Sequence, residues 1–144
     1  MKIYQSKLGK LSGSSYGELI KNARKIYHNI EKQTKRTPYI KSAYFKNQKI
    51  FVNLYFDHLN QKSILDRKRR LKYFECGIDL IKKSHFTPDI RQNPNNKSEK
   101  LYRFYGATID NDLFYVQIKE NQRGNKFYMS SFTPGRDIEE KPRK

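Results

Sequence analysis

The side chains best suited to chemistry in this chain lie around one segment. His58 follows the strand-like run FVNLYF at residues 51–56 and precedes the basic sequence DRKRR at residues 66–70. An imidazole titrates near neutral pH and suits general acid–base work, while neighbouring cations suit the stabilisation of negative charge. Alone, a histidine at such a place is more often a packing residue. Its combination with the cations is what indicates a site for an anionic group.

Metal and nucleotide chemistry has little support in the sequence. His28, His58 and His85 do not have the spacing HxxxH or HExxH, and there is no DxDxDG, GxxxxGK[ST] or GxGxxG motif. The single cysteine, Cys76, lies within a helical pattern and is expected to be a small packing side chain. We therefore expect no metal site and no cofactor.

The charge of the chain indicates a polyanionic partner. Lysine and arginine number 31 against 14 acidic residues, a formal net charge of +17. The composition also fits an AT-rich genome, but such drift does not by itself deplete acids. Nucleic acid is favoured over a membrane surface, because no strongly basic amphipathic helix is evident. Without a signal peptide or an apolar span, we expect a cytoplasmic protein with no membrane partner, which acts in a cytosol whether it is made there or delivered from outside.

RNA suits metal-free chemistry better than DNA does. Its 2′-hydroxyl is a nucleophile already in place, so an enzyme need only remove that proton, protonate the leaving 5′-oxygen and stabilise charge on the phosphate. Histidine, lysine, arginine, tyrosine and serine can supply these functions.

The hydrophobic pattern predicts an α+β domain. Ser15 is the expected N-cap of a first helix that ends before Thr37-Pro38, because the residue before proline disfavours helix. A second helix is expected over residues 63–83 and a polar loop over 84–98. Strands are expected at 39–45, 49–56, 100–108, 113–120 and 126–132.

These elements predict one or more N-terminal helices packed on a twisted antiparallel sheet of about four to five strands. The expected organisation is a flexible basic arm (1–14), a single α+β domain (15–132) and a flexible tail (133–144).

Strand alternation predicts which side chains share a face. Arg103 is expected on the face of the sheet away from Tyr102 and Phe104. Lys119 is likewise expected on the face away from the apolar Val116 and Ile118. In the last strand, Phe127 and Met129 are the expected core residues, which turns Lys126, Tyr128 and Ser130 outward. On the second helix, Arg67 falls within the apolar stripe, whereas Lys68, Arg69 and Arg70 spread around the polar side.

The order of elements resembles the Barnase–EndoU–Colicin–RelE superfamily of small metal-independent ribonucleases, in the versions found in phages and mobile elements. The resemblance covers about residues 50–132. The segments that carry it are YFDHLNQ (55–61), LDRKRRLKYFECGIDLIK (65–82), YRFYG (102–106), FYVQIKE (114–120) and KFYMSSF (126–132).

The resemblance implies a role for each matching residue. His58 is the expected acid–base residue, Arg67 and Arg103 bind phosphate, and Lys119 is the transition-state cation. The hydroxyl of the final strand is Ser130 or its neighbour Ser131.

A second acid–base group is not evident from the pattern, so that Tyr128 or Lys119 would have to serve. Arg69, Arg70 and Lys126 are further expected RNA contacts. They lie on the polar side of the second helix and on the final strand.

The expected function is that of an endoribonuclease, a toxin or phage or mobile-element effector that leaves a 2′,3′-cyclic phosphate. Its substrate is tRNA, rRNA or mRNA, and an acidic antitoxin or immunity protein is an expected partner. Two alternatives fit the same composition. One is a non-catalytic RNA- or DNA-binding protein, and the other is a structural protein that is basic only through genome composition.

Overall fold

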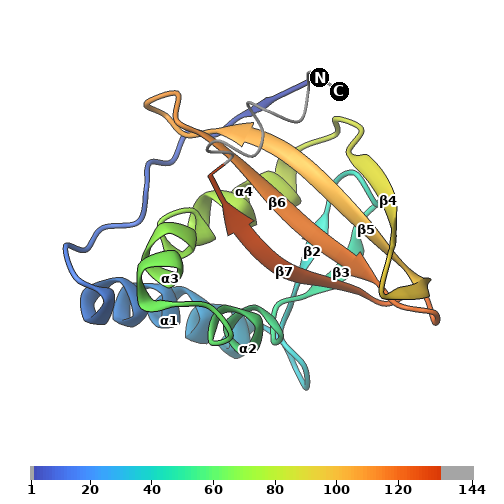
Figure 1. Ribbon diagram of the computed structural model, residues 1–144, viewed down its shortest axis with the longest axis horizontal. Helices are drawn as coiled ribbons and strands as arrows, with labels where there is room; N and C mark the ends of the chain where they lie inside the picture. The colour runs from blue at the N-terminus through green and yellow to red at the C-terminus, as the bar shows by residue number, and fades with distance from the viewer. Residues whose placement is uncertain (1, 134–144) are drawn as a thin grey trace.

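The computed structural model describes residues 2–133 and is an α+β fold, as predicted (Figure 1). This part of the chain contains four helices, α1 (Tyr16–Gln33), α2 (Tyr55–Leu59), α3 (Ile64–Leu71) and α4 (Phe74–Lys83). The strands are β1 (Tyr4–Gln5), β2 (Tyr39–Ser42), β3 (Gln48–Phe51), β4 (Asp89–Asn93), β5 (Asn96–Ala107), β6 (Leu113–Glu120) and β7 (Lys126–Phe132).

The sheet is larger than predicted and is mixed. Of its seven strands within residues 2–133, six follow the order β1-β5-β6-β7-β3-β2. The seventh, β4, pairs with the first two thirds of β5. The β4–β5–β6–β7 and β2–β3 pairings are antiparallel, but β1 runs parallel to β5 and β3 runs parallel to β7. The prediction of a purely antiparallel sheet of four to five strands was therefore wrong.

The helices cover one face of this sheet, where the core lies (Figure 1). The first helix begins as predicted, because the amide of Glu18 donates to the Ser15 hydroxyl at 3.2 Å. Leu19 and Ala23 on α1 are fully buried. The rings of Tyr55, Phe74 and Tyr128 pack together at the centre of the core, with centroids 4.5–5.8 Å apart. No helix within residues 2–133 combines the length and apolar character needed to cross a membrane.

Two predicted elements between residues 49 and 83 were wrong. The strand expected to run to Phe56 ends at Phe51, and α2 follows, burying Tyr55 and Leu59. The single helix expected over 63–83 is two helices, α3 and α4. The break falls at Tyr73, whose ring stacks on Phe114 with centroids 5.6 Å apart. Burial of this ring in the core overrides the helical pattern of the local sequence.

The segment predicted to be a flexible arm instead contains β1 and packs on the domain. Its anchor is the carboxylate of Asp79 on α4, which accepts hydrogen bonds from the hydroxyls of Tyr4 and Ser6, both at 2.8 Å. The Ser6 amide donates to the carbonyl of Ala107 at 2.9 Å. Of the tail predicted at 133–144, only Thr133 is among the described residues.

The predicted loop 84–98 contains β4 and the beginning of β5. Its polar sequence gives no strand signal, and most of its side chains are exposed. The two strands pair through their backbones, and the Asn93 side chain accepts from the Asn95 amide at 3.0 Å in the connecting turn. The extended hairpin projects beside β6 in Figure 1.

The close packing of α4 against β7 leaves no room for a larger residue at position 77. A Cβ atom at Gly77 would overlap the Tyr128 hydroxyl, whereas a Cβ at Gly17 on α1 would meet only the Ser15 hydroxyl at 3.9 Å. We expect Gly77→Ala to lower the free energy of unfolding by about 1–3 kcal/mol through overpacking. The matched control Gly17→Ala should raise it by up to about 1 kcal/mol. Urea denaturation measures both, and equal effects would contradict the packing.

Candidate active site

The face of the sheet turned away from the core carries a set of polar side chains from β5 and β6. Arg103 stands opposite Gln117 in the ladder, and Leu101 stands opposite Lys119. Their neighbours Tyr102, Phe104, Val116 and Ile118 are buried on the core side. The predicted alternation of β5 and β6 is therefore confirmed. We call the opposite side the outer face.

A β-bulge in β7 decides which of its residues reach the outer face. Ile118 pairs with Tyr128, but the next residue of β6, Gln117, pairs with Ser130, so Met129 is an additional residue in β7. Because the bulge reverses the alternation, Ser130 lies on the same side as Gln117. Ser131 turns into the core, where its hydroxyl lies 2.9 Å from that of Tyr55.

Two residues of β7 that were predicted to face outward point into the core. Tyr128 is fully buried, donates to the carbonyl of Phe74 at 3.0 Å, and has its pKa raised well above the ordinary range by burial. Lys126 is 8% exposed, and its ammonium donates to Gln48 at 2.8 Å and pairs with Glu120 at 3.5 Å. Tyr128 therefore cannot supply a proton to a substrate, and Lys126 already has its polar partners.

His58 lies on α2 rather than at the end of a strand, and it is half-buried. Burial lowers the pKa of its imidazole, and the positive charges of Lys62, Arg70 and Lys119 lower it further. The lowered pKa favours the neutral imidazole, and neither ring nitrogen has a hydrogen-bond partner among the described residues.

The cation that reaches the site from α3 is Arg70, not Arg67 as predicted. Arg67 donates from Nε to the carbonyl of Lys62 at 2.9 Å and from Nη2 to that of Asn60 at 2.8 Å. It therefore fastens the connection between α2 and α3. Arg70 donates from Nη1 to the Ser130 hydroxyl at 3.0 Å.

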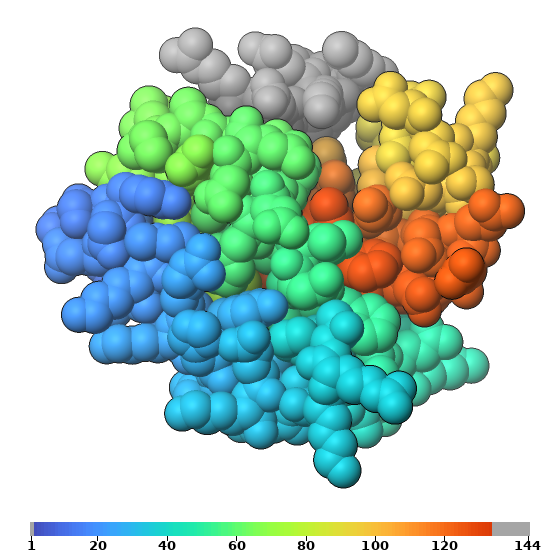
Figure 2. Space-filling model, turned by 90° about the horizontal axis from the view of Figure 1, so that it is seen from below, coloured from blue at the N-terminus to red at the C-terminus, as the bar shows by residue number. Residues whose placement is uncertain are grey.

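The position of Arg70 is set by two further contacts. Its Nε lies 3.2 Å from a carboxylate oxygen of Asp66, although without the alignment of a hydrogen bond. Its guanidinium lies over the ring of Phe132, 4.5 Å from the centroid. Arg69 is exposed on the same helix. Figure 2 shows α3, in green, directly beside β7, in orange-red.

Arg103 belongs to the same cluster of rings and guanidinium groups. Its guanidinium carbon lies 4.4 Å from the ring centroid of Tyr115 and 5.7 Å from that of Phe132. Nη2 donates to the side-chain oxygen of Gln117 at 3.3 Å. The ring of Phe132 therefore has two guanidinium groups near it, those of Arg103 on β5 and Arg70 on α3. These contacts hold two cations in place on the outer face.

Glu99 is a residue of the site that the sequence pattern did not single out. Its carboxylate lies 3.8 Å from the Lys119 ammonium and accepts a hydrogen bond from the side-chain amide of Asn93 at 2.9 Å. Extending the alternation of β5 back from Arg103 by four residues would have placed it on the outer face. The prediction missed it because residues up to 98 were assigned to a loop.

The candidate active site consists of one neutral imidazole, three cations, a hydroxyl, an amide and a carboxylate. Its members are His58, Arg70, Glu99, Arg103, Gln117, Lys119 and Ser130. Such a set can bind a phosphodiester through its cations and transfer protons through the imidazole. Among residues 2–133, no group of three or more His, Cys, Asp or Glu side chains is arranged to hold a metal ion.

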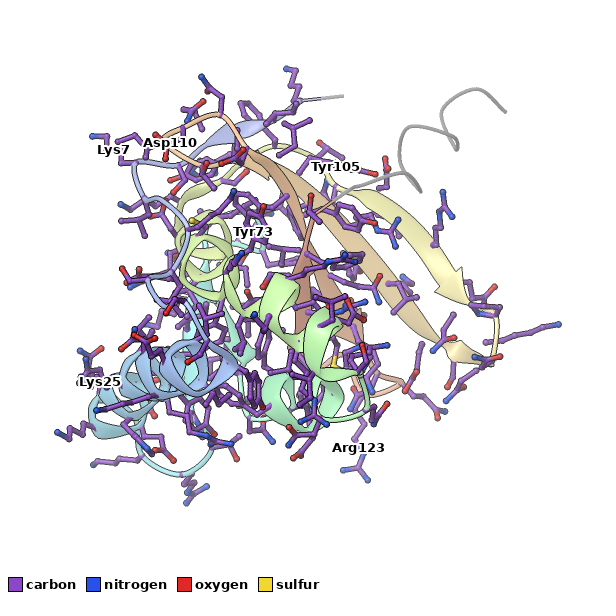
Figure 3. All side chains as sticks on the ribbon, turned by 60° about the vertical axis from the view of Figure 1, so that its left-hand side comes forward. Lys7, Lys25, Tyr73, Tyr105, Asp110 and Arg123 are labelled. Carbon is purple, nitrogen blue, oxygen red and sulfur yellow. The ribbon has the colours of Figure 1, made fainter. Side chains whose placement is uncertain are left out.

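The environment of His58 predicts an acid-shifted titration. We expect the pKa of His58 to lie below its ordinary value of 6.5 and to rise in Lys119→Ala, because that variant removes a positive charge. The exposed lysine Lys25, on α1 and far from the outer face in Figure 3, provides the control variant Lys25→Ala. NMR of the imidazole C–H signals measures the pKa, and a value of 6.5 or above would contradict this geometry.

The lowered pKa of His58 also makes the free energy of unfolding depend on pH. Just below pH 6.5 the unfolded chain binds a proton at His58 that the folded chain does not. The contribution of this residue to the free energy of unfolding therefore rises with pH through that window.

The bulge in β7 predicts different roles for its two serines. Ser131→Ala removes a buried partner of Tyr55 and should lower the free energy of unfolding by about 1–2 kcal/mol. Ser130→Ala removes one hydrogen bond, from Arg70, which can still reach Asp66 and a ligand, so it should cost less stability while weakening phosphate binding. Urea denaturation and phosphate titration test this pair, and the reverse order would contradict these roles of the two serines.

The comparisons with known proteins give no relative for this chain. No protein-family model matches it, and neither a curated protein nor a solved structure matches it.

Proposed function

We propose that this protein is a metal-independent endoribonuclease. The single observation that carries the proposal is the position of half-buried His58 within range of the positive charges of Arg70 and Lys119. Arg70 in turn contacts Ser130 on the outer face. A general base and phosphate-binding cations therefore belong to one surface, as cleavage through the 2′-hydroxyl requires.

The proposed reaction uses His58 as the base and Lys119 as the acid. His58 takes the proton of the RNA 2′-hydroxyl, and the oxygen attacks the adjacent phosphorus. The new O2′–P bond forms as the P–O5′ bond breaks, and the ammonium of Lys119 donates a proton to the leaving 5′-oxygen. The products are a 2′,3′-cyclic phosphate and a 5′-hydroxyl.

The remaining members of the site bind and position. Arg70 and Arg103 hold the non-bridging phosphate oxygens, for which the planar guanidinium fork is well suited. Glu99 positions the Lys119 ammonium, and Ser130 positions Arg70 through the 3.0 Å hydrogen bond. Tyr128 has no part in the reaction.

The biological setting belongs to the same proposal. A ribonuclease of this kind acts as a toxin or as a phage or mobile-element effector on tRNA, rRNA or mRNA. The net charge of +17 would attract an acidic antitoxin or immunity protein to the basic face.

A non-catalytic RNA-binding protein is the second candidate. The observation in its favour is the combination of aromatic rings and cations on the outer face. Phe127 is partly exposed with the Lys119 ammonium 5.9 Å from its centroid, and Phe132 lies beside Arg70. Such surfaces bind single strands by stacking and charge without cleaving them. Cleavage assays separate the two candidates.

The decisive experiment incubates purified protein with 5′-labelled RNA in EDTA. We expect cleavage, with a loss of about 10²–10⁴-fold in His58→Ala and about 10²–10³-fold in Lys119→Ala. Lys25→Ala, which removes a distant charge, should cleave as the wild type does. Activity should fall as the pH drops through the pKa of His58, because the base must be neutral.

Two results would reject the ribonuclease. One is intact RNA after prolonged incubation with folded protein, and the other is full activity of His58→Ala. A substrate with a single 2′-deoxynucleotide at the cleavage site checks the chemistry, since it lacks the nucleophile and should stay intact. If folded protein binds RNA with a steep salt dependence but leaves it uncut, the second candidate is correct.

A further inference from the structure

A small cavity adjoins the proposed phosphate site on the outer face. Its volume is about 150 Å³, which is below the roughly 300–1,000 Å³ of pockets that hold drug-sized ligands. Strands β4, β5 and β6 form its walls, and its lining includes Asp89, Pro94, Leu101, Arg103 and Gln117. Arg103 and Gln117 belong to both the cavity and the candidate active site.

Arg103 offers a flat surface to this cavity. One side of its guanidinium lies over Tyr115, with the carbon 4.4 Å from the ring centroid. The hydrogen bond to Gln117 at 3.3 Å further holds the group in place. Nucleobases stack readily on guanidinium planes, and stacking on an already ordered group loses less side-chain entropy.

The polar groups of the cavity match the edge of a base. Asp89 accepts a hydrogen bond from the Tyr105 hydroxyl through one carboxylate oxygen, at 2.6 Å. Burial and this carboxylate raise the pKa of Tyr105 to about 12, so the phenol keeps its proton and goes on donating. The amide of Gln117 accepts from Arg103 through its oxygen, and its nitrogen remains a donor.

Leu101 and Pro94 add apolar lining on which a ring can pack. The cavity therefore combines a stacking surface, apolar contacts, a carboxylate acceptor and an amide donor. Its size admits one ring system and excludes a base pair. An isolated planar group with hydrogen-bond donors and acceptors would satisfy these contacts together.

We propose that this cavity binds one unpaired nucleobase of the RNA, next to the phosphate held by Arg70 and Arg103. The identification of the ligand as RNA rests on the proposed function. The substrate class is thereby narrowed to single-stranded or looped RNA, because a base within a duplex cannot leave its stack without an energetic cost.

Binding of mononucleotides tests the cavity without requiring cleavage. The probes are the four nucleoside 5′-monophosphates and ribose 5-phosphate, which lacks the base, titrated into ¹⁵N-labelled protein and followed by amide chemical shifts. We expect at least one nucleotide to bind about tenfold more tightly than ribose 5-phosphate, corresponding to roughly 1.4 kcal/mol. The shifts should include residues of β4 and β6.

Two variants locate the base. Leu101→Trp fills the cavity and should remove the difference between nucleotide and ribose 5-phosphate. Asp89→Asn replaces an acceptor oxygen by a donor and should change the order of preference among the four bases. The matched control is Asp110→Asn, an exposed carboxylate on the β5–β6 turn, which should change neither result.

The outcomes separate this inference from the proposed function. Equal binding of nucleotides and ribose 5-phosphate would overturn the base site even if the protein cleaves RNA. A preference that persists in folded Leu101→Trp would also overturn it, because the base would then bind elsewhere. Base-dependent binding that Leu101→Trp abolishes supports the site, whether or not RNA is cleaved.

Discussion

The placement of the Tyr128 ring in the core is the constraint on which the outer face depends. The ring stacks against Phe74 at an interplanar angle of 3°, and Gly77 leaves room for its hydroxyl. With Tyr128 facing inward, regular alternation would turn Ser130 inward as well. The bulge at Met129 reverses the alternation, so one strand supplies a core aromatic and, two residues later, a polar group of the site.

The same arrangement places the helices that complete the site. Tyr55 on α2 packs against Tyr128, and the Tyr55 hydroxyl donates to the carbonyl of Arg70 at 3.2 Å. The Ser131 hydroxyl donates to that carbonyl at 3.3 Å. These buried contacts tie α2, α3 and β7 together. They bring Arg70 to Ser130 on the outer face and place His58 within range of the charges of Arg70 and Lys119, although the two residues come from helices that were not expected as separate elements.

Charge at the site is arranged so that cations remain available to a ligand. Arg67 donates to two backbone carbonyls, and Lys126 is bound by Gln48 and Glu120. Arg70 and Arg103 each donate to one neutral side chain, Ser130 and Gln117, and lie against aromatic rings, which leaves other guanidinium N–H groups for a ligand. The net charge attracts a polyanion over long range, whereas these few fixed cations define where a phosphate binds.

The sequence by itself determined what depends on local pattern. The capped first helix, the faces of β5 and β6 and the outward placement of Arg103 and Lys119 follow from periodicity and capping chemistry, which involve residues close in the chain. Only the tertiary structure decided that Arg70 rather than Arg67 reaches the site and that Tyr128 is buried. Periodicity could have given the face of Glu99, but its contact with Lys119 depends on the register between β5 and β6. Each of these depends on packing between distant segments, which local periodicity does not encode.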